Sequence, residues 1–219
     1  MLYLESGFCK MDIYKLSDFE EKKGGCFRIT DLKQGVKNPN RVNVFVDNEF
    51  AFSLDVAQVV DYKVKVGREI SKEEFDELKN ASEFGKLYQR ALEWVLIRPR
   101  SERETRDYLR RRRPELCEDV ICRLRSHGYL DDRKFAAWWV ENRFVNKGVS
   151  AKRLRMELMK KGVSKEIIDD VLEGSERNDA DEIRKIIKKK RARYDDKKLM
   201  EYLARQGFSY DLIKELINE

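Results

Sequence analysis

The 219-residue sequence has little histidine, proline and cysteine, and these scarcities exclude several classes of site. His127 is the single histidine and the four cysteines form no Cys-x-x-Cys pair, so we expect no metal site. With one histidine, a Ser-His or Cys-His nucleophile is also not expected. No Gly-x-x-x-x-Gly-Lys-Ser/Thr loop is present to cradle nucleotide phosphates. The sequence therefore predicts a protein that is not an enzyme and that needs no cofactor.

Long apolar runs are absent as well. No run reaches the roughly 18 residues that a membrane-spanning helix needs. The opening "MLYLESGFCK" lacks the basic and then apolar pattern of a secretory signal, and Met11 is a second plausible start. Cys9, Cys26, Cys117 and Cys122 are interpreted as reduced thiols. We therefore expect a cytoplasmic protein with no membrane partner.

Charge is abundant, and it is unevenly distributed along the chain. Residues 1–80 carry 13 Lys and Arg against 15 Asp and Glu, whereas residues 81–219 carry 34 against 26. A basic C-terminal part indicates a polyanionic partner such as nucleic acid, although a solvated helical surface has a similar composition.

Residues 26–83 are predicted to form a small α+β region. "CFRITDLKQG" and "RVNVFVDNEFAFSL" alternate apolar and polar residues, and Asp47-Asn48 suits a tight hairpin turn. A short helix is expected at "DVAQVVDY", and a return strand at "KVKVG", residues 63–67. Ser71 and Glu74 form a capping box that predicts a helix to about residue 80.

From about residue 84 the pattern is helical, and one unit of three helices is repeated. "LMKKGVSKEIIDDVL" at 158–172 returns as "LARQGFSYDLIKELI" at 203–217. Three equivalent middle helices are marked by pairs four residues apart, which are Thr105-Leu109, Leu154-Leu158 and Leu199-Leu203. Gly162 and Gly207 are expected at left-handed C′ positions, and Ser164 and Ser209 as N-caps of the third helices. Ser101 and Glu104 are predicted to form another capping box.

The fold class predicted is mainly α, with three tandem three-helix repeats preceded by a small N-terminal α+β region that contains a β-hairpin. The expected boundaries are an N-terminal segment of open role at 1–25, the α+β region at 26–83, and repeats at 84–131, 132–176 and 177–219. Such arrays present extended surfaces more often than pockets.

Each repeat carries one basic cluster near its middle helix. Residues 98–113, 143–165 and 184–198 hold eight, eight and nine basic residues against three, one and two acidic ones. Arginine binds phosphate with two parallel hydrogen bonds, and Tyr108 or Tyr194 could stack on bases. The candidate contacts to the partner are Arg98, Arg100, Arg103, Arg110, Arg111, Arg112, Arg113, Arg143, Lys147, Lys152, Arg153, Arg155, Lys160, Lys161, Lys188, Lys189, Lys190, Arg191 and Arg193.

"GYLDDRKFAAWWVENR", followed by "KGVSAKRLRMELMKKGV", resembles the bacterial RecX family of regulators of the RecA recombinase. The order of the flanking pieces, from "ALEWVLIRPRSERETRDYLRRR" onward, also resembles the family. The likeness covers about residues 88–219 well and 26–80 more loosely. It implies tandem three-helix repeats that bind in the groove of a RecA–DNA filament and inhibit it without catalysis.

The family has no catalytic residues to transfer, and several of its signature positions are interpreted as scaffold. Asp131 and Asp132 are interpreted as the N-cap and first-turn acid of a helix rather than as magnesium ligands. Asp195-Asp196 departs from the serine expected at the start of the third middle helix. The signature positions are Gly128, Tyr129, Leu130, Asp131, Asp132, Phe135, Ala136, Arg153, Leu154, Glu157, Leu158 and Gly162.

We therefore expect a monomeric modulator of RecA filaments that binds single- and double-stranded DNA weakly and with little sequence preference. The alternative is a helix-turn-helix transcription regulator, which the acid-rich third helices disfavour. A nuclease is a more distant alternative, for want of a metal cluster.

Overall fold

The structure is a computed structural model that describes residues 25–36, 38–146, 148–175 and 177–218, with the side chains of 144–146 excepted. The chain forms two compact units. One comprises the described part of Met1–Glu93 together with Arg113–Arg123, and the other Trp94–Arg112 together with Leu124–Glu219. Over the described ranges, no helix combines the length and the apolarity that crossing a membrane requires.

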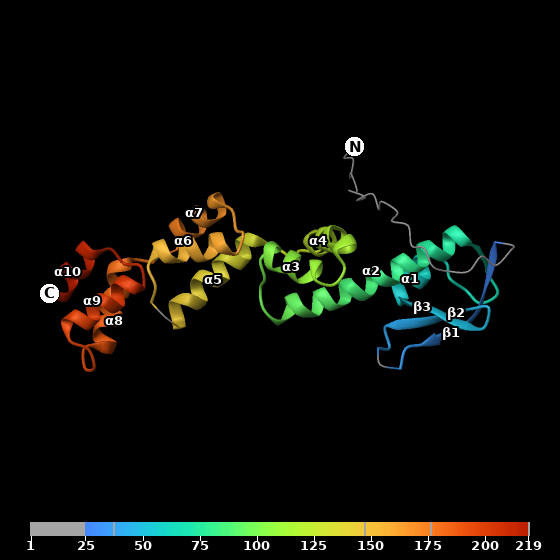
Figure 1. Ribbon diagram of the computed structural model, residues 1–219, viewed down its shortest axis with the longest axis horizontal. Coiled ribbons are helices and arrows are strands. Elements are labelled where there is room, and N and C mark those ends of the chain that lie inside the picture. The colour runs from blue at the N-terminus through green and yellow to red at the C-terminus, as the bar shows by residue number, and fades with distance from the viewer. Residues whose placement is uncertain (1–24, 37, 147, 176, 219) are drawn as a thin grey trace. The chain divides into compact units, whose positions relative to one another are not determined.

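The first unit contains a four-stranded antiparallel sheet in the order β3-β2-β1-β4 (Figure 1). The strands are β1 (Cys26–Gln34), β2 (Arg41–Val46), β3 (Glu49–Asp55) and β4 (Glu69–Ser71). Asp47 and Asn48 join β2 to β3 with φ of 51° and 67°. Both values are positive, as a two-residue hairpin turn requires, so the predicted hairpin is confirmed.

The predicted return strand at residues 63–67 is wrong. Lys63 has a φ of 51° and Gly67 a φ of 86°, so both ends of the segment turn away from extended geometry. The amide of Val64 instead donates to Val59 O at 2.9 Å, which closes a turn after α1 (Val56–Asp61). The strand that returns to β1 begins two residues after Gly67, as β4.

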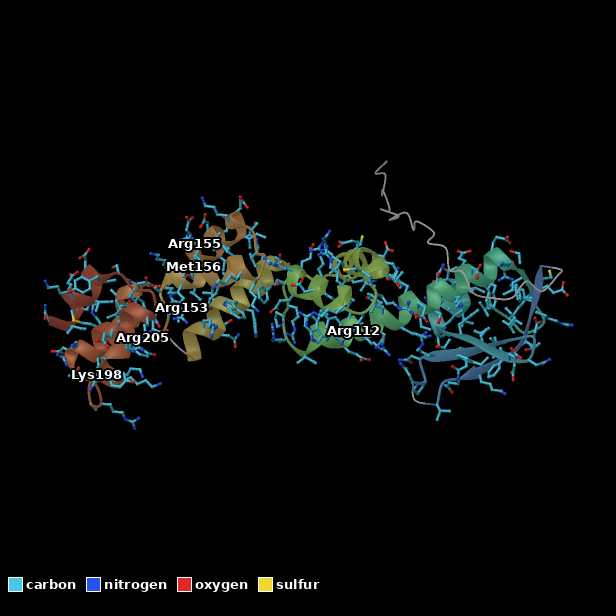
Figure 2. All side chains as sticks on the ribbon, viewed as in Figure 1. Arg112, Arg153, Arg155, Met156, Lys198 and Arg205 are labelled. Atoms are coloured by element: carbon cyan, nitrogen blue, oxygen red, sulfur yellow. The ribbon has the colours of Figure 1, made fainter. Side chains whose placement is uncertain are left out.

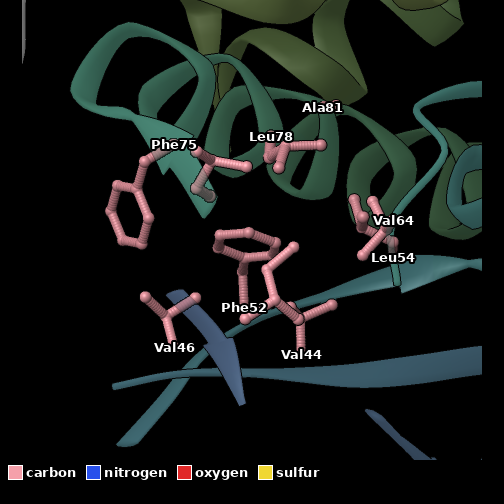
Figure 3. Packing of buried hydrophobic residues seen from close by; sticks show 10 residues of the cluster. Val44, Val46, Phe52, Leu54, Val64, Phe75, Leu78 and Ala81 are labelled. Atoms are coloured by element: carbon pink, nitrogen blue, oxygen red, sulfur yellow. The ribbon is translucent and has the colours of Figure 1, made fainter. Parts of the chain in front are cut away.

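The core of this unit lies between the sheet and the start of α2 (Lys72–Ile97). Side chains of β2 and β3 meet Phe75, Leu78 and Ala81 of α2 (Figure 3). The rings of Phe52 and Phe75 lie edge to face with centroids 5.6 Å apart. The alternation of apolar residues along the strands therefore places one face of the sheet against α2.

Helix α2 is one continuous helix of 26 residues, whereas the sequence predicted a helix that ends near residue 80 and a separate helical region from about residue 84. The capping box at its start is confirmed, because Ser71 Oγ accepts from Glu74 N at 3.2 Å and Glu74 Oε2 from Ser71 N at 3.0 Å. Gly85 does not break the helix. A Cβ there would lie 3.0 Å from Gln58 Oε1, so this glycine serves close packing against the Gln58 side chain.

After α2 the chain forms the predicted tandem helices (Figure 1). They are α3 (Glu102–Arg110), the short 3-10 helix η1 (Pro114–Leu116), α4 (Cys117–Ser126), α5 (Asp132–Asn146), α6 (Ala151–Lys160), α7 (Lys165–Glu173), α8 (Asp179–Lys190), α9 (Asp196–Arg205) and α10 (Tyr210–Asn218). We call α3, α6 and α9 the middle helices. Helices α5–α7 enclose one core around Phe135, Leu154 and Ile168, and α8–α10 a second around Ile183, Leu199 and Ile213.

Glycine follows the middle helix where the sequence predicted a left-handed residue. Gly162 has a φ of 84° and Gly207 a φ of 90°, which L side chains rarely adopt. Ser164 then accepts from Ile167 N and caps α7, as predicted, and α10 begins directly after Ser209. These local signals define the turn between the second and third helices.

Candidate interaction surface

The N-caps give a common frame for comparing the three middle helices. Ser101, Ser150 and Asp195 each accept a hydrogen bond from the amide three residues later, and each has the extended backbone of an N-cap. The sequences of α3, α6 and α9 can therefore be aligned by counting residues from these three N-caps.

Two positions of the middle helix are basic in all three repeats. The second residue after the N-cap is Arg103, Lys152 or Lys197, and the tenth is Arg111, Lys160 or Arg205. All six side chains are exposed, and none of them forms an ion pair with another described residue. Lys197 and Arg205 were not among the predicted contacts, although aligning the three N-caps in the sequence would have identified them.

Many of the other predicted contacts are instead paired within the protein. Arg98 and Lys161 both reach Glu104, and Arg143 and Arg153 both reach Glu157. Burial raises the pKa of Glu104, but its hydrogen bonds with Lys161 and Arg98 outweigh burial and bring the pKa below its ordinary value. These basic residues therefore have less charge free for a partner than the sequence suggested.

The first joint between repeats is made at the N-terminus of α3. Ser101 Oγ donates to Lys161 O at 2.7 Å, and Glu102 N donates to Asp132 Oδ1 at 2.8 Å. Glu104 was predicted to complete a capping box with Ser101. Its carboxylate binds Arg98 and Lys161 instead, because the following repeat brings a lysine to this helix end.

The second joint repeats this arrangement at the N-terminus of α6. Ser150 N donates to Gln206 O at 3.1 Å, and Ala151 N donates to Asp179 Oδ1 at 3.0 Å. Arg153 Nη1 donates to Arg205 O at 2.6 Å, so Arg153 and Arg205 meet at this joint (Figure 2). At both joints an aspartate of one repeat accepts from the first amide of the preceding middle helix, and a carbonyl beside its glycine turn accepts from the serine N-cap of that helix.

An aromatic pair in the second unit lies between two arginines. The rings of Trp94 and Tyr108 are stacked with centroids 4.4 Å apart, the guanidinium of Arg100 lies 4.0 Å from Trp94, and that of Arg112 lies 3.7 Å from Tyr108. A ring has two faces, and both faces of Tyr108 are covered. The expectation that Tyr108 stacks on bases is therefore wrong.

The arginine run at 110–113 is divided between different roles. Arg113 pairs with Glu83 at 2.9 Å and with Glu115 at 3.3 Å, and Arg112 also donates to Tyr108 O. Arg111 is the exposed member at the recurring position, and Arg110 is exposed with contacts of its own.

The third basic cluster lies at the end of α8. Lys188, Lys189 and Arg193 are exposed, and cations in the last turn of a helix are favoured by its dipole. Lys190 lies 4.5 Å from the Tyr202 ring and 5.1 Å from the Tyr194 ring, and Arg191 pairs with Asp196 at 3.7 Å. Arg155 pairs with Asp169 in the same way at 2.6 Å. Lys147 lies outside the described residues.

The signature positions are mostly scaffold, as predicted for several of them. Leu130, Phe135, Ala136, Leu154 and Leu158 are buried. Gly128 has a φ of 73°, and Gly162 of 84°, both at turns. Asp131 caps α5 by accepting from the amides of Arg133 and Lys134. The side chain of Tyr129 is 43% exposed, and its ring stacks on His127.

Asp132 and Glu157 do more than the sequence indicated. Burial, together with the nearby charges of Glu102 and Asp131, raises the pKa of Asp132 at the first joint. Glu157 accepts from Arg143, Arg153 and Trp139 Nε1. Among the described residues, no group of three or more His, Cys, Asp or Glu side chains is placed to hold a metal ion.

Two family models match the sequence. The model described as RecX, second three-helix domain, matches residues 131–172, and that of the regulatory protein RecX N-terminal domain matches residues 27–71.

Curated relatives match over most of their length. The regulatory protein RecX of Bacillus subtilis (strain 168) is 31% identical over 202 residues, which is 87% of this chain and 76% of the relative. The regulatory protein RecX of Clostridium botulinum (strain Eklund 17B / Type B) is 29% identical over 206 residues, 88% of this chain and 95% of the relative.

Two solved structures share the fold. A crystal structure of regulatory protein RecX has a TM-score of 0.69 at 21% identity and covers 88% of this chain and 100% of its own. That of RecX from Lactobacillus salivarius has a TM-score of 0.54 at 23% identity, over 63% of this chain and 96% of its own. At these identities the likeness shows the fold alone.

The fold and the exposed cations define a helical-repeat protein with a small N-terminal sheet and a basic surface. Such proteins present extended surfaces to partners. The chain belongs to the RecX family, as the Bacillus subtilis relative shows, and this is a family of regulatory proteins and not of enzymes. The predicted fold class and the family resemblance are both confirmed.

Proposed function

We propose that this protein binds filaments of the RecA recombinase on DNA and inhibits recombinase activity, without a cofactor and without catalysis of its own. The observation that carries the proposal is the recurrence of two exposed cations on each middle helix. A filament presents equivalent sites at regular intervals, and three equivalent modules on one chain bind such a partner with reinforced affinity.

The same cations support weak, sequence-tolerant binding to single- and double-stranded DNA. Lysine and arginine at exposed positions bind phosphate without reading base edges. We further propose that the protein is a monomer in the cytoplasm. Its repeats are proposed to comprise residues 84–131, 132–176 and 177–219.

No observation favours the alternative of a transcription regulator. The third helix α7 would have to enter the major groove as a recognition helix. Its nine residues include four acids and one lysine, so a base-reading α7 would bring carboxylates toward the phosphates. This charge opposes a base-reading role for α7.

The test measures ATP turnover by a RecA recombinase on single-stranded DNA against added protein. We expect the native chain to suppress turnover substoichiometrically and to hydrolyse no ATP itself. The variant Arg103→Gln/Lys152→Gln/Lys197→Gln loses one exposed cation per repeat. It is expected to need on the order of tenfold more protein, since three exposed contacts contribute about 0.5 kcal/mol each.

The matched control is Lys72→Gln/Lys165→Gln/Lys214→Gln, which removes three exposed lysines that form no ion pair in the described chain. Equal loss in both variants would show that only total charge matters. If inhibition rises only in proportion to the DNA that the protein itself occupies, the protein merely competes with the recombinase for the strand. That outcome would contradict the proposal.

A further inference from the structure

A groove of about 520 Å³ lies at the second joint, between α6 and α9. Its sides come from the exposed face of α6 and from the end of α9 with the glycine turn that follows. The residues that line this groove include Lys152, Met156, Lys160, Ala204, Arg205 and Phe208. Figure 2 shows Arg153 and Met156 on α6 and Arg205 on α9 at this joint.

The groove carries unneutralised positive charge. Lys152, Lys160 and Arg205 are exposed and form no ion pair in the described part of the chain, and Arg205 Nε donates only to Glu201 O of its own helix. The one carboxylate in the lining is Glu157, which already accepts from two arginines. An occupant with carboxylates or phosphates is therefore favoured electrostatically.

Met156 gives the groove an apolar centre, because its side chain is 51% exposed. The equivalent residues of the other middle helices are Asp107 and Glu201, which suit a solvated helix surface. An unbranched thioether adapts its shape to a partner's apolar side chain, and methionine is used in this way at peptide-binding surfaces. The exposed Ala204 lies in the same lining and adds a small apolar side chain to it.

The lining offers no platform for nucleic-acid bases. Its one aromatic residue is Phe208, which is only 5% exposed. Base stacking on exposed aromatic rings is the usual means of holding a single strand in a basic groove. Carboxylates beside an aliphatic side chain match the groove better than phosphates beside bases.

We propose that this groove binds an acidic peptide segment of a protein partner, with an aliphatic side chain of that segment on Met156 and its carboxylates facing Lys152, Lys160 and Arg205. This proposal deepens the proposed function. The binding of an acidic peptide does not depend on that function, whereas the identification of the partner as the recombinase does. The remaining recurring cations, Arg103, Arg111 and Lys197, are then available to DNA.

The first experiment does not require the recombinase. Fluorescence anisotropy of the full chain is measured with three short labelled peptides: glutamates around one leucine, glutamates alone, and serines around one leucine. We expect the first to bind at least several-fold more tightly than the others, and Met156→Glu to abolish the preference. The matched control is Met159→Glu, on the same helix, since Met159 is also exposed (55%) but lies outside the groove.

Equal binding of the three peptides, or equal loss in the two glutamate variants, would overturn the proposal. A labelled oligothymidylate is measured in the same way. If it binds more tightly than the peptide with glutamates around leucine, and if Met156→Glu but not Met159→Glu abolishes its binding, the groove belongs to nucleic acid instead. Circular dichroism and melting of both variants check that the fold is retained, and the conservative Met156→Leu is expected to keep the preference.

The second experiment places a photo-crosslinking phenylalanine analogue at 156 or 159 in the full chain and adds RecA–DNA filaments. We expect a crosslink from 156, and not from 159, to an acid-rich segment of the recombinase. If the peptide experiment succeeds and no crosslink forms, the groove proposal stands and the recombinase assignment fails. If filaments bind normally while the peptide experiment fails, the groove proposal alone is wrong.

Discussion

At the residue scale, the decisive property of a charged side chain in this protein is whether a partner of opposite charge lies within reach. Arg155 and Lys160 are both basic and lie on one helix, yet Arg155 pairs with Asp169 and Lys160 pairs with no described carboxylate. An exposed ion pair contributes little to stability but leaves less charge for a partner. Residue type alone therefore overestimates the contact surface.

Asp132 gives a prediction at this scale. Its raised pKa means that the folded protein binds a proton there more readily than the unfolded chain does. This contribution to stability is present below the ordinary carboxyl pKa and is lost as the pH rises through the folded-state value. Asp132→Asn keeps an acceptor for Glu102 N and removes the half-buried charge, so we expect a melting temperature at pH 7 at least as high as that of the native chain.

Asp132→Ala is expected to lower stability by about 1 kcal/mol, because the amide at the start of α3 loses its acceptor. Differential scanning calorimetry between pH 3 and 7 (roughly the carboxyl range and above it) checks both variants. The advantage of the asparagine variant should shrink toward the acidic end, and a constant or growing advantage would contradict the assignment.

At the element scale, the glycine turns have two functions that the structure separates. Gly162 ends α6 with a positive φ, and a Cβ there would lie 2.6 Å from Arg103 Cβ of the preceding repeat. Gly128 also has a positive φ, but a Cβ there would meet nothing within 4 Å. The first glycine therefore serves both a turn and a joint, and the second serves a turn.

Substitution of each glycine by alanine tests this difference. Gly128→Ala is expected to cost about 1–2 kcal/mol, the penalty of a left-handed conformation for an L residue. Gly162→Ala should cost more, because the new methyl group also displaces Arg103 at the first joint. Urea unfolding of both variants measures the loss in unfolding free energy. An equal loss in the two variants would mean that Arg103 moves away from the new methyl group without an energetic penalty.

At the scale of the whole molecule, two joints link three helical modules by the same means. Ser101 and Ser150 are completely buried where the next repeat packs on them, whereas Asp195, at the equivalent position of the third middle helix, is exposed. The departure from serine at this position thus coincides with a helix start whose capping side chain is exposed. Serine suits the joint because its small hydroxyl can be buried, and a carboxylate suits an exposed cap.

The salt dependence of DNA binding tests the recurring cations on this scale. Neutralising Arg103, Arg111 and Lys197 together to glutamine should reduce the slope of log affinity against log salt for single-stranded DNA by about 2, at ~0.7 per phosphate contact. The Lys72, Lys165 and Lys214 triple variant should leave the slope unchanged. Titrations at several salt concentrations measure this slope. An equal change in both variants would show that DNA affinity depends on the total charge of the protein and not on these three positions.

The local structure of this protein was readable from sequence alone. Apolar spacing, the serine caps, the Asp47-Asn48 turn and the glycines after the middle helices each depend on interactions within a few residues, so they predicted the elements and the repeat. The same local view ended a helix near residue 80, within the continuous α2, and it gave no reason for Gly85, which the packed Gln58 side chain explains. The predicted capping box at Glu104 failed for the same reason.

Tertiary structure alone decided which charges are free and where the groove lies. Glu104 and Lys161 meet although they are 57 positions apart in the sequence, and Arg153 and Arg205 meet although they are 52 apart. Such pairs form only when one repeat packs on the next, and their energy depends on burial and distance that no local pattern contains. Packing likewise covers both faces of Tyr108 and leaves the thioether of Met156 exposed beside three unpaired cations.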